Sequence, residues 1–206
     1  MEKSTIVWGL VLLVIAGLLL YFLSFKKPME QQLPSEPVSS NADVILHTTK
    51  GDIGIDLFTE QMPITTQNFL KLSKEGYYDK TKFHRVIPQF MIQGGDSNTK
   101  GDNKDTYGMG GPGYTIQDEF VAGLSNVRGT IAMANTGTPN SGGSQFFINV
   151  VDNTGLDFDT PPFTSSHPVF GTVVSGMDVA DAIAIVPRDA NNVPLDPVVI
   201  ESVEVR

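Results

Sequence analysis

The segment that most constrains the fold is residues 83–96, where two short runs of apolar and β-forming residues flank Pro88. Proline cannot donate a hydrogen bond within a sheet, so Pro88 predicts a bend between two strand segments, and a pair of glycines ends the second one. Because side chains alternate along a strand, Arg85 points to the face opposite His84. The segment therefore presents a guanidinium beside an apolar floor, without a nucleophile or a pair of carboxylates.

The composition indicates a globular domain with an appendage. The 206 residues are 40% hydrophobic and 18% charged, and 20 glycines and 13 prolines favour short strands and many turns over long helices. Cysteine is absent, which excludes disulfide bonds, thiolate catalysis and cysteine-based zinc sites. The formal net charge of −9 argues against nucleic-acid binding, because neutralising phosphates requires lysine and arginine.

Short strands and two helices account for most of the chain after residue 42. Alternating runs at 44–48 and 52–57 predict a hairpin, and apolar residues at helical spacing predict a helix over 63–74. Further strands are expected at 130–134, 145–150, 169–174 and 198–205, and a second short helix at 178–185. About eight short strands can close into a barrel filled by side chains, which removes exposed sheet edges.

The N-terminal segment contains an uncharged run over residues 6–25 that predicts a transmembrane helix. At about 1.5 Å per residue, a helix of this length spans the hydrocarbon layer of a bilayer. The run is longer than that of a usual signal peptide and no small-x-small cleavage pattern follows it, so we expect an uncleaved anchor over 1–27. Residues 28–42, rich in Pro, Gln, Ser and Glu, predict a flexible linker to a domain at 43–206.

Three blocks of the domain resemble the signature of the cyclophilin-type peptidyl-prolyl cis-trans isomerases. They are residues 83–96, 128–135 and 143–149, in the order and at about the spacing of that family. The resemblance extends over residues 43–206 and is closest to the bacterial type. It implies a closed eight-stranded antiparallel β-barrel capped by a helix at each end. It also implies an enzyme, a peptidyl-prolyl cis-trans isomerase that catalyses rotation about X-Pro bonds in other proteins and thereby assists their folding.

Rotation about an X-Pro bond needs neither proton transfer nor a covalent intermediate. The barrier of roughly 18–20 kcal/mol arises from amide resonance, so a catalyst must bind the twisted amide better than the planar one. Twisting localises the lone pair on the prolyl nitrogen, where a hydrogen-bond donor stabilises it. A guanidinium is always charged and offers several donors in a fixed plane, which makes Arg85 the candidate.

The resemblance implies the remaining site residues. Arg85, Gln93 and Phe90 would form the catalytic group. The proline ring and the flanking peptide would be held by Met91, Ala134, Asn135, Gln145, Phe147, Leu156 and His167. The pattern alone leaves open that the apolar residues among these are simply barrel core. His167 is placed by the residues that follow it, although the loop before it is longer than in the family.

Other chemistries receive little support from the sequence. The three histidines lack metal-ligand spacing, so neither a metal nor a cofactor is expected, and His84 is expected to pack inside the barrel. Ser144 lacks the context of a nucleophile elbow. Two alternatives stay open: a membrane-tethered module or chaperone that binds proline peptides with little turnover, and a purely structural envelope protein.

Position 155 departs from the family pattern. Many members carry an aromatic residue, often tryptophan, where this chain has Gly155, and the only tryptophan here is Trp8. Phe158 or Phe163 could fill the space. An indole packs on cyclosporin and donates a hydrogen bond to it, so the resemblance implies weak cyclosporin binding.

The charges around the anchor do not decide on which side of the membrane the domain lies. Lys26 and Lys27 follow the apolar run and favour a cytoplasmic domain, while Lys3 and the amino terminus oppose this weakly. Signal-anchored relatives commonly face outward. We therefore expect a single-pass membrane protein with a monomeric, extracytoplasmic isomerase domain that acts on proline-containing proteins and peptides.

Overall fold

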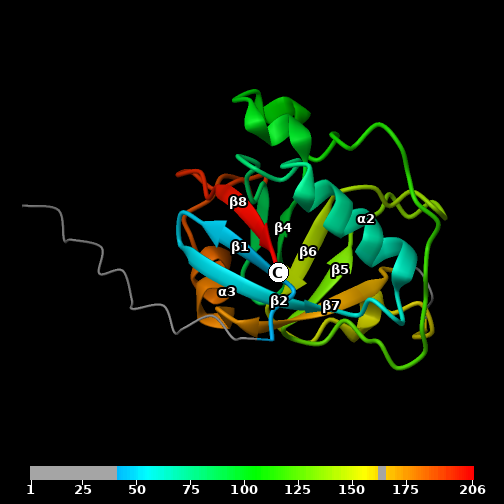
Figure 1. Cartoon of the computed structure of the whole chain (residues 1–206). Helices are drawn as coiled ribbons and strands as arrows, with labels where there is room; N and C mark the ends of the chain where they lie inside the picture. The colour runs from blue at the N-terminus through cyan, green and yellow to red at the C-terminus, as the bar shows by residue number, and fades with distance from the viewer. Residues whose placement is uncertain (1–40, 162–165) are drawn as a thin grey trace, which may run out of the picture. The chain divides into compact units, whose positions relative to one another are not determined.

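The computed structural model describes residues 41–161 and 166–206, which form a mainly β domain (Figure 1). Its eight strands make one antiparallel sheet in the order β3-β4-β6-β5-β7-β2-β1-β8. The transmembrane helix predicted over 6–25 lies outside the described residues. Within the described ranges, no helix is both long and apolar enough to cross a membrane.

The elements have the following bounds. The strands are β1 (Val44–Thr48), β2 (Gly51–Leu57), β3 (Arg85–Ile87), β4 (Met91–Gly94), β5 (Thr130–Met133), β6 (Phe146–Asn149), β7 (Val169–Ser175) and β8 (Ile200–Val205). The helices are α2 (Pro63–Lys74) and α3 (Met177–Ala184), with 3₁₀-helices η1 (Ser97–Lys100), η2 (Lys104–Thr106) and η3 (Thr154–Leu156). The predicted hairpin and the helix over 63–74 are confirmed.

The sheet is a half-barrel and not the closed barrel that the family resemblance implied. Strands β3 and β8 are its two edges, and among the described residues they are not paired with each other. The segments beside them meet through an isolated bridge from Lys82 to Val199 and a few backbone hydrogen bonds, such as that from the N–H of Phe83 to the carbonyl of Val198 at 2.9 Å. Prolines contribute to this open seam, because Pro88 ends β3 after three residues and Pro197 has no N–H to donate before β8 begins.

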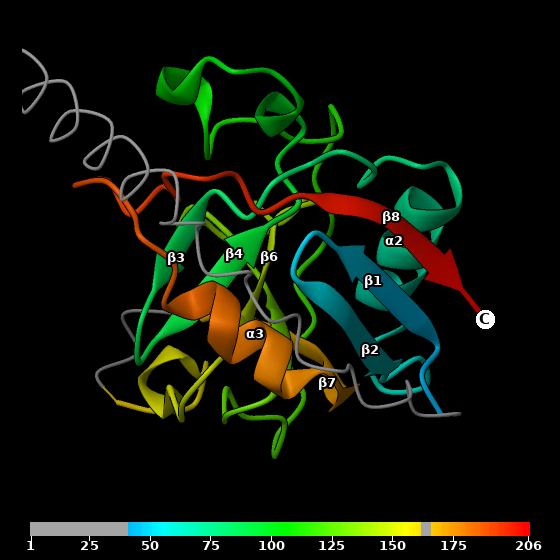
Figure 2. The same ribbon diagram turned by 90° about the vertical axis from the view of Figure 1, so that its left-hand side faces the viewer.

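The main core lies between the sheet and the two helices. Helix α2 packs against β8, and α3 packs against β2, β3 and β4 (Figure 2). Phe69 of α2 stands at the centre, with ring centroids 5.0 Å from Tyr78, 5.6 Å from Phe146 and 5.4 Å from Phe170. Tilted and edge-on aromatic contacts of this kind stabilise the core beyond simple burial.

A second, smaller apolar cluster lies on the opposite face of the sheet. Ile92 and Phe146 belong to the main core, whereas their neighbours Met91 and Phe147 belong to the second cluster with Ala132. Alternation of side chains along β4 and β6 produces this division. Met91 and Phe147 are therefore not barrel core, the interpretation that the sequence pattern alone had left open.

Candidate functional site

A pocket of about 220 Å³ opens on the face of the sheet that carries the second apolar cluster. Its lining residues are Arg85, Phe90, Met91, Gln93, Ala134, Asn135, Phe147, Leu156 and His167. Every site residue proposed from the sequence is in this set except Gln145, which lines an adjoining pocket. Residues from several separate parts of the chain thus meet at one place.

The register of the sheet brings the central residues together. Arg85 of β3 pairs with Gln93 of β4, Gln93 pairs with Phe147 of β6, and Phe147 pairs with Ala132 of β5. Directly paired residues of neighbouring strands point to the same face. These pairs therefore form one row across four strands, with the charged residue at the sheet edge and the apolar residues towards the middle.

The floor of the pocket is apolar and almost fully buried. Met91 and Phe147 are 1% and 4% exposed. The His167 ring lies edge-on to Phe147 with centroids 5.3 Å apart, and its Nδ1 lies 3.1 Å from the carbonyl oxygen of Met133. Burial lowers the pKa of His167, so its ring is neutral at neutral pH, and Nδ1–H must donate because a carbonyl only accepts.

Arg85 lies at the rim, where its guanidinium faces the pocket. Its Nη1 donates to Oε1 of Gln93 at 3.3 Å, and its Cζ lies 5.8 Å from the centre of the Phe90 ring. Burial lowers the pKa of Arg85, but a guanidinium starts so high that it stays charged. The charged guanidinium of Arg85 therefore lies beside the apolar floor and has further N–H groups that can donate to a substrate.

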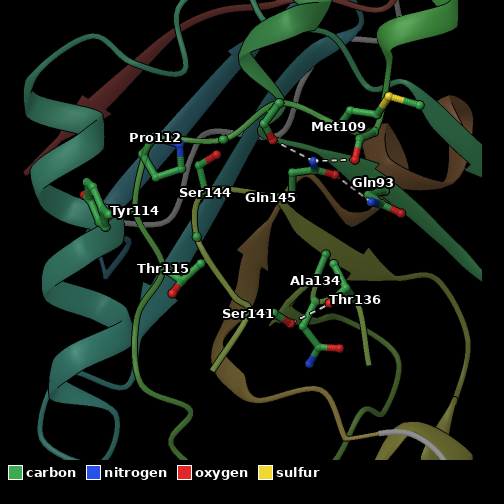
Figure 3. A pocket seen from close by; sticks show the side chains of 15 residues that line it. Gln93, Met109, Pro112, Tyr114, Thr115, Ala134, Thr136, Ser141, Ser144 and Gln145 are labelled. Carbon is green, nitrogen blue, oxygen red and sulfur yellow. Dashed lines mark hydrogen bonds between the residues drawn. The ribbon is translucent and has the colours of Figure 1, made fainter. Parts of the chain in front are cut away.

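Gln93 and Gln145 connect this pocket to a second pocket of about 440 Å³, shown in Figure 3. Nε2 of Gln93 donates to Oε1 of Gln145 at 3.0 Å. Gln93, Ala134 and Asn135 line both pockets, so the two are continuous. The sequence analysis did not assign the other walls of the second pocket, which include Met109, Pro112, Tyr114, Thr115 and Ser141.

The side chain of Asn135 connects its own loop to the segment that contains Ser166. Its Nδ2 donates to the carbonyl of Ser166 at 2.7 Å, and its Oδ1 accepts from the N–H of Gly137 at 3.0 Å. The amide of Ala134 donates to the carbonyl of Gln145 at 2.9 Å. The backbone of this stretch is thereby held at the junction of the two pockets.

Gly155 precedes Leu156, which lines the first pocket, and leaves an open place there. A Cβ built there would meet none of the described atoms within 4 Å. Phe158 does not fill the place, because it stacks on Phe120 with ring centroids 5.1 Å apart. Phe163, the other candidate from the sequence, lies outside the described residues.

The remaining histidines belong to different surroundings. His84 is 5% exposed, as expected for a side chain opposite Arg85, and burial lowers its pKa. His47 lies on the surface between Asp52 and Glu204. In the part of the chain that the structure describes, no group of three or more histidine, cysteine or acidic side chains is placed to hold a metal ion.

Comparison with known proteins gives a consistent result over the whole described domain. The family model for cyclophilin type peptidyl-prolyl cis-trans isomerase/CLD matches residues 43–205. A peptidyl-prolyl cis-trans isomerase of Acinetobacter baylyi is 43% identical over 171 residues, covering 81% of this chain and 87% of the relative. Peptidyl-prolyl cis-trans isomerase B of Escherichia coli is 44% identical over 167 residues, covering 79% of this chain and 98% of the relative.

Solved structures are similar as well. A cyclophilin type peptidyl-prolyl cis-trans isomerase of Cryptosporidium parvum, crystallised in the presence of the dipeptide Ala-Pro, superposes with a TM-score of 0.70. It is 32% identical in sequence, and the match covers 79% of this chain and 98% of that one.

Proposed function

The chain belongs to the cyclophilin-type peptidyl-prolyl cis-trans isomerase family, and we propose that its isomerase activity resides in the pocket around Arg85. The observation that carries this proposal is the row formed by Arg85, Gln93 and Phe147 across neighbouring strands. It places a hydrogen-bond donor and an apolar receptacle within one pocket, the two things that rotation of an X-Pro bond requires.

In the proposed mechanism the proline ring enters the apolar part of the pocket. Met91, Phe147 and Leu156 contact the ring, while Arg85 donates to the prolyl nitrogen as its lone pair develops during rotation. Phe90 and Gln93 hold the guanidinium in place. Because the interaction strengthens as the amide twists, it lowers the barrier and does not merely retain the substrate.

The peptide on either side of the proline would follow the two connected pockets. Gln93, Gln145 and the backbone at Ala134 and Asn135 stand at their junction, where polar groups can hold an extended chain. His167 closes the opposite wall of the proline pocket with a neutral ring. That the Cryptosporidium parvum protein was crystallised in the presence of the dipeptide Ala-Pro supports a proline-containing peptide as the ligand of these pockets.

A protease-coupled isomerisation assay on an Ala-Pro peptide tests the proposal with the full-length chain. Arg85→Ala should lower the rate by on the order of 10²–10³, the typical loss for one preorganised donor. Arg85→Lys should recover little, because an ammonium cannot reproduce the planar group of donors. Arg188→Ala is the matched control, since it removes an exposed arginine that lies outside the pocket lining. Full activity in folded Arg85→Ala would overturn the mechanism.

The same assay addresses the two alternatives. A binding module would retain the peptide but leave its isomerisation at the uncatalysed rate, and a purely structural protein would do neither. The isomerase relatives, together with Arg85, Gln93 and Phe147 in one row, favour turnover. The proposed substrates are proline-containing proteins and peptides, and the proposed role is assistance in protein folding.

The proposed setting of the enzyme follows from the sequence. The run over 6–25 would anchor the chain in a membrane as a single-pass protein, and residues 28–42 would link it to the domain at 43–206. The domain would act as a monomer on the extracytoplasmic side. Its acidic charge supports the absence of nucleic acid among its partners.

A further inference from the structure

A directed chain of hydrogen bonds runs from the proposed catalytic arginine to a loop on the far side of the second pocket. Arg85 donates to Gln93, and Gln93 donates to Gln145. Nε2 of Gln145 then donates to two backbone carbonyls, those of Gly108 at 3.0 Å and Gly110 at 2.8 Å (Figure 3). These contacts span residues that are far apart in the sequence.

The groups at the two ends of this series of hydrogen bonds determine which atom donates and which accepts at each step. A guanidinium only donates, so the oxygen of Gln93 must face Arg85 and its NH₂ must face Gln145. Carbonyls only accept, so the NH₂ of Gln145 must face Gly108 and Gly110 and its oxygen must face Gln93. If either side-chain amide were rotated so that its oxygen and NH₂ exchanged places, a donor would face another donor. The loop that carries the two carbonyls therefore helps to orient Gln93.

A buried carboxylate holds that loop. Asp96 is 0% exposed, and its Oδ1 accepts from the N–H of Asn98 at 2.7 Å. Its Oδ2 accepts from the N–H of Gly108, the residue whose carbonyl receives Gln145. Charge-assisted hydrogen bonds to a carboxylate are stronger than those between neutral groups. Asp96 therefore holds the loop at Gly108, where the loop accepts the hydrogen bond from Gln145.

Gly110 packs directly over the same carboxylate. A Cβ at Gly110 would come within 2.0 Å of Oδ1 of Asp96, so a side chain could enter only if the loop or the carboxylate moved. The second carbonyl that receives Gln145 is thus fixed by close approach to Asp96, as the first is fixed by a hydrogen bond. Two independent contacts lead from Asp96 to the two acceptors of Gln145.

We propose that Asp96 is a positioning residue for the isomerase site, which fixes the loop carbonyls of Gly108 and Gly110 and through Gln145 and Gln93 orients Arg85. The inference rests on the proposed role of Arg85. Asp96 itself lies outside the lining of both pockets and touches no substrate in this scheme. Its effect is on the orientation of the donor, and the apolar floor that binds the proline ring is untouched.

The first test is Asp96→Asn in the full-length chain. Asparagine can still accept from Asn98, but its NH₂ meets the N–H of Gly108, so the loop loses one attachment. We expect kcat for an Ala-Pro peptide to fall about 10-fold with KM nearly unchanged, because the donor remains but is less well oriented. The side-chain amide NMR signals of Gln93 should shift in the substrate-free protein.

A second variant and a control distinguish a specific effect on the loop from a general loss of structure. Gly110→Ala forces the loop away from Asp96 while leaving the carboxylate intact, so it should show the same fall in kcat and the same shift of the Gln93 signals. Asn103→Ala removes the cap of η2 in the same loop, where Oδ1 accepts from the N–H of Asp105 at 3.2 Å. That control should change neither quantity.

A double-mutant cycle decides whether Asp96 acts through Gln145. If it does, Asp96→Asn should slow the Gln145→Ala protein no further, because the connection is already broken. Multiplying effects, or folded Asp96→Asn and Gly110→Ala proteins with unchanged kcat and Gln93 signals, would overturn the inference. A failure of the proposed function would look different: Arg85→Ala would stay active while the Gln93 signals still responded to Asp96→Asn.

Discussion

At the scale of single residues, the side chain of His47 connects protonation to stability. Its Nδ1 lies 2.9 Å from Asp52 and its Nε2 lies 3.3 Å from Glu204, so both ring nitrogens face carboxylates. Burial by itself lowers the pKa of His47, but the hydrogen bonds and charges of Asp52 and Glu204 outweigh burial and raise the pKa above its ordinary 6.5. The protonated ring, which donates from both nitrogens, is the form that these partners stabilise.

The sign of the resulting pH dependence follows from the raised pKa. Stabilisation by His47 is fully present below the unfolded value of 6.5 and is lost as the pH rises through the higher folded pKa. We expect His47→Gln to lower the free energy of unfolding more at about pH 6 than at about pH 8. Urea denaturation of both proteins at the two pH values measures this. An equal difference at both values would contradict it.

The glycine at position 155 predicts how strongly cyclosporin inhibits the enzyme. A tryptophan there would meet open space, and it would add both an apolar face and an N–H donor beside the proline pocket. A hydrogen bond contributes about 0.5–1.5 kcal/mol net and a buried aromatic at least as much, together one or more factors of ten in affinity. We therefore expect weak inhibition of the unmodified enzyme by cyclosporin and tighter inhibition of Gly155→Trp, with little change in turnover.

Titrating isomerase activity with the drug measures this effect. Gly155→Phe is the matched control, because it supplies a ring without the N–H donor and should gain only part of the sensitivity. Tight inhibition of the unmodified chain would show that another part of the protein already supplies this wall.

At the scale of elements, helix α2 is capped from a distant segment. Its N-cap residue, Met62, provides no side-chain hydrogen bond. Instead, the carboxylate of Glu119 accepts from the N–H of Ile64 at 3.0 Å and from the N–H and hydroxyl of Thr65 at 2.7 and 2.8 Å. A negative charge at a helix N-terminus also interacts favourably with the helix dipole. One side chain thus fastens the loop before β5 to α2.

Removing this cap should destabilise the protein. We expect Glu119→Ala to lower the free energy of unfolding by about 1–2 kcal/mol, the usual cost of losing a helix cap together with its charge. Glu75→Gln is the matched control: it removes an exposed carboxylate at the C-terminal end of α2, where negative charge is unfavourable, and should not destabilise. Denaturant titration of both variants compares them. Equal losses would show that the contact of Glu119 is not what matters.

The elements that local sequence signals determine were predicted well. Helix α2 begins at Pro63, the expected first helical position, and its apolar residues repeat at helical spacing, so the predicted bounds match. The hairpin of β1 and β2 turns at Gly51, whose φ of 131° favours glycine. The candidate site could not be predicted from local signals, because the row from Arg85 to Phe147 depends on the register between strands that are distant in the sequence. Only the family resemblance indicated these residues.

Features that depend on long-range contacts were missed. The sequence predicted no regular element between residues 97 and 106, whereas the structure forms η1 and η2 there, beside Asp96. An aspartate directly after Gly95 and a second glycine-rich stretch at 108–113 were the only available signals. The stacking of Phe158 on Phe120 and the open seam beside Lys82 likewise involve segments far apart in the chain.

At the scale of the whole molecule, the two ends of the folded domain meet. The N–H of Arg206 donates to the carbonyl of Asp43 at 2.8 Å, and the N–H of Asp43 donates to the carbonyl of Ile55 at 2.9 Å. A side-chain oxygen of Asp43 accepts from the N–H of Leu57 at 2.9 Å. These hydrogen bonds fasten the two ends of the domain to each other and to β2.

This arrangement predicts that the isomerase works without its N-terminal segment. We expect a protease to cut the full-length protein within residues 28–41, where the composition predicts a linker, and to release a soluble domain. Its kcat and KM for an Ala-Pro peptide should equal those of the uncut chain, because every residue that lines the two pockets lies at position 85 or later. Before cleavage the activity should sediment with membranes, and afterwards it should stay in the supernatant. Loss of activity on cleavage would mean that the anchor or the linker belongs to the catalytic unit, and activity in the supernatant from the start would argue against the anchor.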